Sequence, residues 1–258
     1  MIIRRVMITR PREHGERLAA ILRSLAIEPV LVPSVSIEPP ATYALLDDAV
    51  RRLDQYQWVL FTSRTGVRVF FERVVFVGRH VPDHLRWAAV GPGTADALHE
   101  RDVVDVWIPT QYLSESLGQE LPAQPGQRVL RIRAQAASSL PAGRLRSRGI
   151  DVDEVVAYRT VEAPPDSVPL LQEAFAGGVD GVLFTSASTV RGFARLIQHS
   201  DLKDEAARLT VIAIGPVTAD AIRAIGWPVH VVASEYSLDG IATVIRRGQT
   251  DASGIARN

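Results

Sequence analysis

The chain has 258 residues, with 29 lysines and arginines, 29 aspartates and glutamates, and no cysteine. A formal net charge of zero argues against a general nucleic-acid-binding protein, because such proteins carry a basic excess. The lack of cysteine excludes disulfides, thiolate nucleophiles and cysteine metal sites. No secretory signal pattern is present, and no apolar run approaches the ~18 residues needed to span a bilayer, so we expect a cytoplasmic protein.

The first forty residues alternate between short apolar runs and a helical pattern. Residues 5–9 and 30–35 are predicted as buried strands, and residues 12–25 carry apolar side chains at helical spacing. The prolines in 38–40 end this stretch, because proline continues neither a helix nor a central strand.

The chain then keeps the same alternation of strand, polar turn and helix. The expected elements are a helix at 43–53, a strand at 58–61, a turn at 62–64, a helix at 65–72, a strand at 88–90, a turn at 91–93 and a helix at 94–100. The tail at 248–258 is polar, and we expect it to be disordered.

The second half of the chain repeats the first. WVLFTSRTGVRVFFERV, which starts at Trp58, returns as GVLFTSASTVRGFARLI, which starts at Gly181, a displacement of 123 residues. AAVGPGTADAL, which starts at Ala88, returns as AIGPVTADAI, which starts at Ala213. A period this long indicates a duplicated domain-sized unit. Together with the alternating strands and helices, it predicts an α/β fold of two similar lobes with mostly parallel sheets.

Two proline-marked segments are candidate crossings between the lobes. If both are linkers, one lobe is continuous and the other is built from both ends of the chain. The alternative is two sequential lobes divided near 124–126, and composition leaves both arrangements open. The boundaries of the first arrangement are lobe 1 at 1–36 and 166–258, lobe 2 at 40–160, and linkers at about 37–40 and 161–165.

Four polar turns, paired by the duplication, follow expected strands and precede expected helices. A helix N-terminus at the carboxyl end of a parallel strand is where open α/β sheets bind ligands, and its N–H groups and dipole favour anions. The serines and threonines also have a purely structural role open to them, as helix caps. Taken together, the turns predict two lobes that close on one ligand with several anionic groups. Their candidate ligand-binding residues are Thr62, Ser63, Gly91, Thr94, Thr185, Ser186, Gly215 and Thr218.

Motifs for metals and nucleotides are missing from the sequence. His80 and His84 have the spacing of a helical zinc pair, but Pro82 lies between them and argues against that helix. No Walker motif, strand-linked GxGxxG or GxSxG is present. We therefore expect no metal and no cofactor.

The paired FTS turns, the paired GP-x-TA turns and VVAYRTVEAP resemble the uroporphyrinogen-III synthase family, as do ITRP at 8–11 and SEYSLDGI at 234–241. The resemblance runs from about Ile2 to Ile245. It implies two α/β lobes joined by a two-strand linker with both chain ends in one lobe, which selects the discontinuous arrangement. It also implies a cofactor-independent lyase of heme biosynthesis. Such an enzyme removes the terminal hydroxyl of hydroxymethylbilane as water, inverts ring D and closes the octacarboxylate to uroporphyrinogen III.

Carried over by position, the resemblance makes Tyr158 the catalytic residue that assists departure of the hydroxyl, and Arg10 a carboxylate partner. The eight turn residues named above become substrate-binding residues. Arg131 and Arg133 do not match ITRP cleanly and are left out of the site. The partners implied are a small-molecule substrate, no nucleic acid and no membrane, and we expect a monomer. The alternative is a non-catalytic ligand-binding or sensor module with the same fold.

Overall fold

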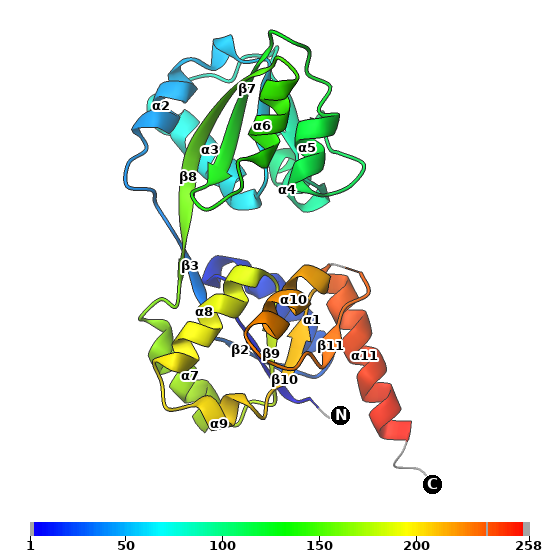
Figure 1. The fold of residues 1–258 in the computed structure, drawn as a ribbon. Coiled ribbons are helices and arrows are strands. Elements are labelled where there is room, and N and C mark those ends of the chain that lie inside the picture. The colour runs from blue at the N-terminus through cyan, green and yellow to red at the C-terminus, as the bar shows by residue number, and fades with distance from the viewer. Residues whose placement is uncertain (1–2, 236, 255–258) are drawn as a thin grey trace. The chain divides into compact units, whose positions relative to one another are not determined.

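The computed structural model describes residues 3–235 and 237–254, with side chains as far as residue 246. The chain forms two units, each a mostly parallel sheet with its own helices (Figure 1). Unit 1 comprises Met1–Ile37 and Val161–Asn258, and unit 2 comprises Glu38–Thr160. The chain leaves unit 1 within strand β3 (Val35–Glu38) and returns within strand β8 (Asp151–Glu162), which are neighbours in one sheet.

Unit 1 has a five-stranded sheet in the order β11-β10-β9-β1-β2, and its strand pairs are all parallel. Its elements are β1 (Arg5–Ile8), a 3-10 turn (Arg12–His14), α1 (Glu16–Ser24), β2 (Glu28–Leu31), α7 (Ser167–Ala176), β9 (Gly181–Phe184), α8 (Ala187–Gln198), α9 (Lys203–Ala206), β10 (Thr210–Ala213), α10 (Pro216–Ala224), β11 (Val231–Val232) and α11 (Leu238–Gly254).

Unit 2 has a six-stranded sheet in the order β3-β8-β7-β4-β5-β6. Its elements are α2 (Ala44–Arg51), a 3-10 turn (Leu53–Gln55), β4 (Trp58–Phe61), α3 (Arg64–Val77), β5 (Arg86–Ala89), α4 (Pro92–His99), β6 (Val106–Trp107), α5 (Ser114–Glu120), β7 (Arg128–Ala134), α6 (Leu140–Ser147) and β8.

The two units share one strand order. In unit 1 the strands numbered along the chain lie in the order 2-1-3-4-5, which is the flavodoxin-like doubly wound order. In unit 2, β7, β8, β4, β5 and β6 correspond in turn to strands 1 to 5 of unit 1 and lie in the same order, 2-1-3-4-5. Strand β3 is added at the edge, beside β8. The registers agree as well, since Ile8 pairs with Leu183 in unit 1 as Arg131 pairs with Leu60 in unit 2. The sequence displacement of 123 residues is therefore also a structural equivalence.

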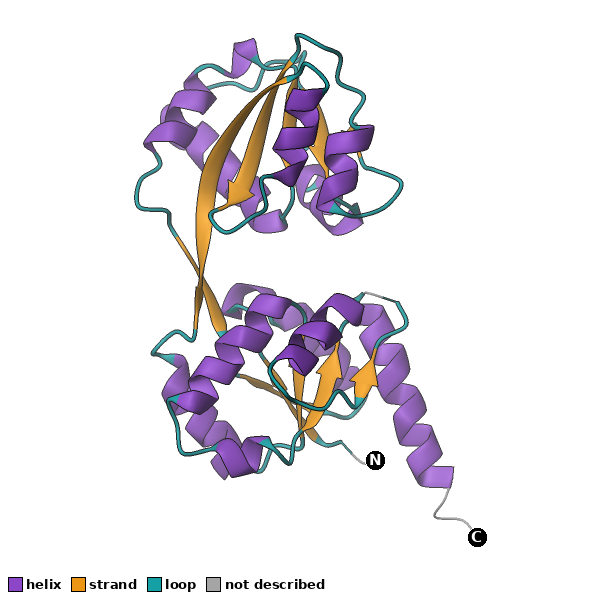
Figure 2. Ribbon diagram, in the orientation of Figure 1, coloured by secondary structure: helices purple, strands orange, loops and turns teal. Residues whose placement is uncertain are grey.

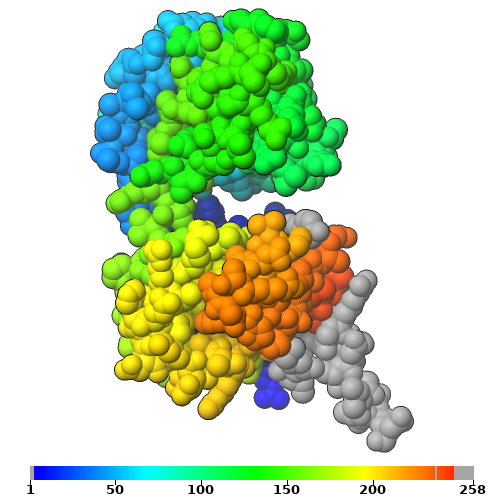
Figure 3. Space-filling view, viewed as in Figure 1, coloured from blue at the N-terminus to red at the C-terminus, as the bar shows by residue number. Residues whose placement is uncertain are grey.

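Each sheet is covered by helices on both faces, as Figure 2 shows. In unit 1 successive residues of β9 serve opposite cores: Phe184 packs with Phe193 of α8, whereas Leu183 packs with Leu18 of α1 and Ile241 of α11. Side chains of α8 to α10 hide the sheet of unit 1 in the space-filling view (Figure 3). This two-sided burial explains why the strands appear in the sequence as continuous apolar runs.

Several expected elements differ from the structure. The single strand expected at 30–35 is two strands, β2 and β3, because the chain turns at residues 32–34. The expectation of a disordered tail is wrong for residues 248–254, which continue α11. Residues 255–258 lie outside the described part of the chain. Within the described residues, no helix is long and apolar enough to cross a membrane.

Candidate functional site

The strand order places the candidate residues. In doubly wound sheets, ligands bind outside the carboxyl ends of the strands at the point where the strand order reverses. That point lies between β1 and β9 in unit 1 and between β7 and β4 in unit 2. The paired FTS turns follow β9 and β4, and the paired GP turns follow the adjacent strands β10 and β5. All eight turn residues therefore lie at carboxyl strand ends, four in each unit.

The two FTS turns have nearly the same geometry. Ser63 caps α3 in extended conformation, and its Oγ accepts a hydrogen bond from the Gly66 N–H at 3.0 Å. Ser186 caps α8 in the same way, and its Oγ accepts from the Thr189 N–H at 3.3 Å. Thr62 and Thr185 immediately precede these caps and are half-buried. The capping interpretation of both serines is therefore confirmed, and their hydroxyls keep further hydrogen-bonding capacity.

The two GP turns are also alike. Gly91 and Gly215 are the extended caps of α4 and α10, each followed by proline at the first helical position. Thr94 and Thr218 are buried in the first turn of each helix. Neither threonine hydroxyl has a hydrogen-bond partner among the described residues, and neither oxygen is sealed from solvent. Proline supplies no N–H, and the Thr94 N–H bonds to the Gly91 carbonyl at 3.0 Å. The threonine hydroxyls and the remaining N–H groups of each first turn are thus available to an anion.

Tyr158 and Ser63 are brought together although they are 95 positions apart in the chain. Tyr158 lies in β8 opposite Ala134, the last residue of β7, and is 9% exposed. Its phenol donates a hydrogen bond to Ser63 Oγ at 2.9 Å. Burial raises the pKa of Tyr158, and the hydrogen bond with Ser63 partly opposes that rise. The phenol is therefore a neutral donor throughout the physiological range.

Arg10 follows β1 in unit 1, beside the FTS turn of β9. Its side chain is half-buried and, among the described residues, makes no hydrogen bond or ion pair. Burial lowers the pKa of Arg10, and the charge of Arg17 lowers it further. A desolvated guanidinium without a carboxylate is an unusual arrangement, and it suits a site that receives an anionic ligand.

Arg133 is the structural counterpart of Arg10, an equivalence that the sequence repeat did not reveal. Ile8 and Arg131 occupy equivalent positions in the registers of the two sheets. Arg10 and Arg133, each two residues further along the chain, are therefore equivalent as well. Arg133, unlike Arg10, has protein partners, since its guanidinium donates to the carbonyls of Ala137 at 2.8 Å and Gln135 at 3.4 Å. Arg133 thus orders the loop after β7.

Arg131 is also occupied by the protein. It is 1% exposed and forms an ion pair with Glu154, its register partner in β8. Burial lowers the pKa of Arg131, and Glu154 opposes that effect. Its Nε has no hydrogen-bond partner among the described residues. The pair belongs to the packing of the sheet, consistent with leaving Arg131 out of the site.

Two residues that sequence reasoning missed hold the turns of unit 2 in place. Arg64 donates to the Gly93 carbonyl at 2.9 Å and pairs with Glu100 at 2.6 Å, so it ties α3 to α4. Tyr112 is 60% exposed and packs closely on Gly91. A Cβ atom added to Gly91 would lie 3.1 Å from the Cβ atom of Tyr112. The repeat of Gln-Tyr at 111–112 as Glu-Tyr at 235–236 was a signal for Tyr112.

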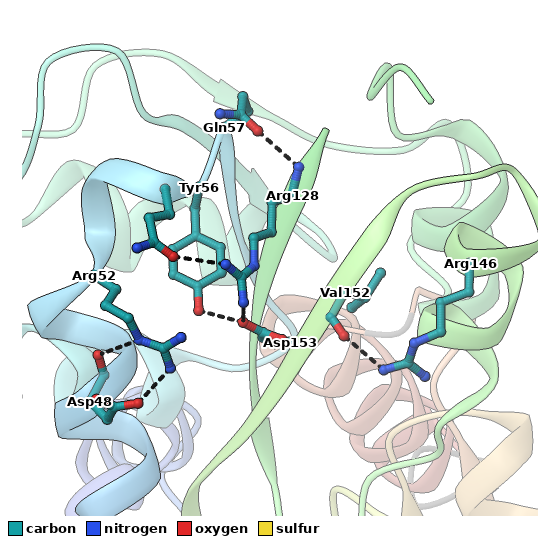
Figure 4. Close-up of polar contacts among 9 residues, drawn as sticks. Asp48, Arg52, Tyr56, Gln57, Arg128, Arg146, Val152 and Asp153 are labelled. Carbon is teal, nitrogen blue, oxygen red and sulfur yellow. Dashed lines mark hydrogen bonds and ion pairs between the residues drawn. The ribbon is translucent and has the colours of Figure 1, made fainter. Parts of the chain in front are cut away.

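A second polar cluster lies at the opposite, amino ends of the strands of unit 2 (Figure 4). Tyr56 donates to Asp153 at 2.6 Å, and Arg128 pairs with the same carboxylate at 2.8 Å. Burial and the hydrogen bond to Asp153 both raise the pKa of Tyr56. The groups of this cluster bind one another, so we assign it a structural role.

The cavities within single units lie away from the turns. One of about 400 Å³ is lined by Leu209 and Trp227, before β10 and β11, and one of about 510 Å³ by Leu85 and Trp87 near the start of β5. No group of three or more histidines, aspartates or glutamates among the described residues has the arrangement of a metal site.

Comparisons with known proteins agree on one family. The family described as uroporphyrinogen-III synthase HemD matches residues 16–243. A uroporphyrinogen-III synthase of Synechococcus elongatus is 29% identical over 96% of both chains. The porphyrin biosynthesis protein HemD of Ruminiclostridium josui is 30% identical over 92% of this chain, which spans 47% of that longer protein. The crystal structure of a mutant uroporphyrinogen III synthase from the extremely thermophilic bacterium Thermus thermophilus superimposes with a TM-score of 0.62 at 27% identity, covering 97% of this chain and 99% of that one.

Proposed function

The chain belongs to the uroporphyrinogen-III synthase family, and on that premise we propose that it cyclises hydroxymethylbilane to uroporphyrinogen III in tetrapyrrole biosynthesis. The observation that carries the proposal is the duplicated set of helix N-termini at the carboxyl strand ends. A substrate with eight carboxylates needs many anion-binding groups, and no cluster of lysines supplies them, because Lys203 is the only lysine. Backbone N–H groups and the helix dipoles fit that need.

Substrate binding is assigned to both units. Thr62, Ser63, Gly91 and Thr94 are the candidates of unit 2, and Thr185, Ser186, Gly215 and Thr218 those of unit 1. Arg10 adds a half-buried cation that pairs with no carboxylate among the described residues. Its planar guanidinium suits a bidentate bond to one substrate carboxylate.

The first chemical step is loss of the terminal hydroxyl. The carbon–oxygen bond breaks with both electrons going to oxygen, and the adjacent pyrrole nitrogen stabilises the carbocation that remains. We assign Tyr158 to this step because its phenol is neutral, is fixed by a hydrogen bond and lies beside the carboxyl end of β7. Hydrogen-bond donation to the leaving oxygen lowers the barrier as negative charge develops there.

The second task is to invert ring D before the macrocycle closes. Closure releases a proton from the attacked pyrrole carbon, which balances the hydroxide lost earlier, so the overall change is loss of one water. No cofactor is needed for this sequence. Fixing the carboxylates of a flexible chain at many points restricts which ring carbon meets the reactive carbon.

The test is turnover of freshly generated hydroxymethylbilane by the purified chain. Without enzyme this substrate closes to the type I isomer, so the isomer composition of the product is the readout. We expect type III product in the presence of the chain. A protein that binds the substrate or product but leaves the product as type I is the non-catalytic module instead.

The proposal includes a monomer that acts in the cytoplasm. Sedimentation of the purified chain with and without product tests the first part, and fractionation of cells that express the chain tests the second.

A further inference from the structure

The hydrogen bonds around Ser63 leave one proton without an acceptor. Its Oγ accepts from the Gly66 N–H at 3.0 Å and from the Tyr158 phenol at 2.9 Å. A serine hydroxyl has two lone pairs and one proton, so both acceptor positions are filled. Among the described residues Ser63 Oγ donates to no acceptor. Its proton is therefore directed away from both partners, in a side chain that is half-buried rather than sealed.

The Tyr158 phenol has the opposite arrangement. Its proton is already committed to Ser63 Oγ, and the residue is only 9% exposed. Direct donation to a substrate would require the phenol to break that bond first. Donation by Ser63 requires no rearrangement, and a hydroxyl that itself accepts two hydrogen bonds becomes a stronger donor through polarisation.

The duplicated turn supplies an internal comparison. Ser186 occupies the same capping position in unit 1, but its Oγ lies 3.0 Å from the Ser188 hydroxyl, so it has a protein hydroxyl as a partner. A register shift in β8 just before Tyr158 makes its counterpart in unit 1 either Val35 or Ser34, by displacements of 123 or 124. Val35 has no hydroxyl, and the Ser34 hydroxyl donates to the Thr189 carbonyl at 2.7 Å rather than to Ser186. Among the residues that the structure describes, the hydrogen-bonded pair of tyrosine and capping serine is therefore found in unit 2 alone.

We propose that Ser63 is the group that donates a hydrogen bond to the leaving hydroxyl of the substrate, and that Tyr158 is a positioning residue that acts through Ser63. The inference rests on the proposed function and refines the role of Tyr158 within it. As the carbon–oxygen bond breaks, the hydroxide departs with the electron pair, held by the Ser63 O–H. Neither Ser63 nor Tyr158 loses its proton, because the proton released at ring closure converts the hydroxide to water.

The test is a double-mutant cycle on the full chain, with kcat and KM for hydroxymethylbilane measured for Ser63→Ala, Tyr158→Phe and the double variant. We expect Ser63→Ala to lower kcat about 10- to 100-fold, the effect of losing a hydrogen bond to a developing charge. Tyr158→Phe should lower kcat by the same factor or less, and the double variant should match Ser63→Ala. KM should change little, and Ser63→Thr, which keeps the hydroxyl, should restore most of kcat.

Two controls separate chemistry from folding. Ser63→Ala also removes a helix cap, so the stability of each variant is measured by denaturation and kcat is determined where the variant is folded. Ser186→Ala removes the matching cap in unit 1, and its effect should multiply with that of Tyr158→Phe, because Tyr158 bonds to Ser63 and not to Ser186.

The outcomes distinguish the possible roles. A folded Ser63→Ala protein with wild-type kcat, beside a strongly impaired Tyr158→Phe, would show that the phenol donates directly. Loss of stability in both variants with an unchanged kcat would make the pair purely structural. In either case a wild-type protein that produces type III leaves the proposed function intact. A wild-type protein that yields only type I overturns both proposals.

Discussion

Replacing Arg10 with methionine should weaken substrate binding without destabilising the protein. Arg10 is desolvated, repelled by Arg17 and without an acceptor among the described residues. Methionine keeps the apolar length of the side chain and removes the charge. We therefore expect the free energy of unfolding to stay the same or to rise by up to about 1 kcal/mol.

The effect on the reaction should be large by comparison. A hydrogen bond between charged groups contributes about 1.5–3 kcal/mol, which corresponds to a loss of about 10- to 150-fold in kcat/KM. The loss should fall mainly on KM, because the assigned role of Arg10 is to hold a carboxylate that does not react. Initial rates of type III formation at several substrate concentrations measure it, and urea denaturation measures stability.

Arg133→Met is the matched control, because Arg133 occupies the equivalent place in unit 2. It donates to two loop carbonyls, so its removal should lower the free energy of unfolding by about 1–3 kcal/mol. The two arginines should thus respond in opposite directions. An Arg10→Met protein that is destabilised while its KM is unchanged would refute the reasoning, since Arg10 would then be a structural residue.

Three further predictions concern packing and ionisation. Glu154→Gln alone leaves Arg131 buried without its carboxylate and should destabilise the protein by about 3–5 kcal/mol, whereas Arg131→Met should cost less, because Glu154 keeps its ion pairs with Arg133 and Arg146; denaturant midpoints check both. Because the pKa of Tyr56 is raised above its ordinary value of 10.0, the stability it confers is complete below pH 10 and is lost as the pH rises further. Tyr56→Phe should therefore lose less stability than wild type between about pH 8 and about pH 11, and equal losses would contradict this. Gly192→Ala should destabilise strongly, because a Cβ there would lie 2.0 Å from a carbonyl oxygen, whereas Gly93→Ala meets no atom within 4 Å and should leave the melting temperature nearly unchanged.

Local patterns were sufficient to predict much of the fold. Strand β4 was expected at its observed bounds, Trp58–Phe61, because a run of apolar residues ends at a polar turn and the same run recurs at β9. The parallel sheets followed from the alternation of strands and helices. These signals are visible in the sequence itself and need no knowledge of which distant residues are in contact.

Long-range pairing set the limits of that prediction. The crossing between units lies within β3 and β8, strands far apart in sequence whose pairing no local pattern encodes. The equivalence of Arg133 with Arg10 was missed because LRIRAQ lacks the proline of ITRP, and only the registers of β1 and β7 align the two. The resemblance to a family singled out Tyr158, but its bond to Ser63 joins residues 95 positions apart.

The most direct measurement of the central claim is the isomer composition of the product when the protein is present far below one molecule per substrate molecule. Hydroxymethylbilane is generated in place by the enzyme that makes it, and the product isomers are separated chromatographically after oxidation. A synthase should turn over many times. Nearly all of the product should therefore be type III even when each protein molecule is outnumbered many times by substrate molecules. Type I product throughout, or type III only in proportion to the protein added, would contradict the account.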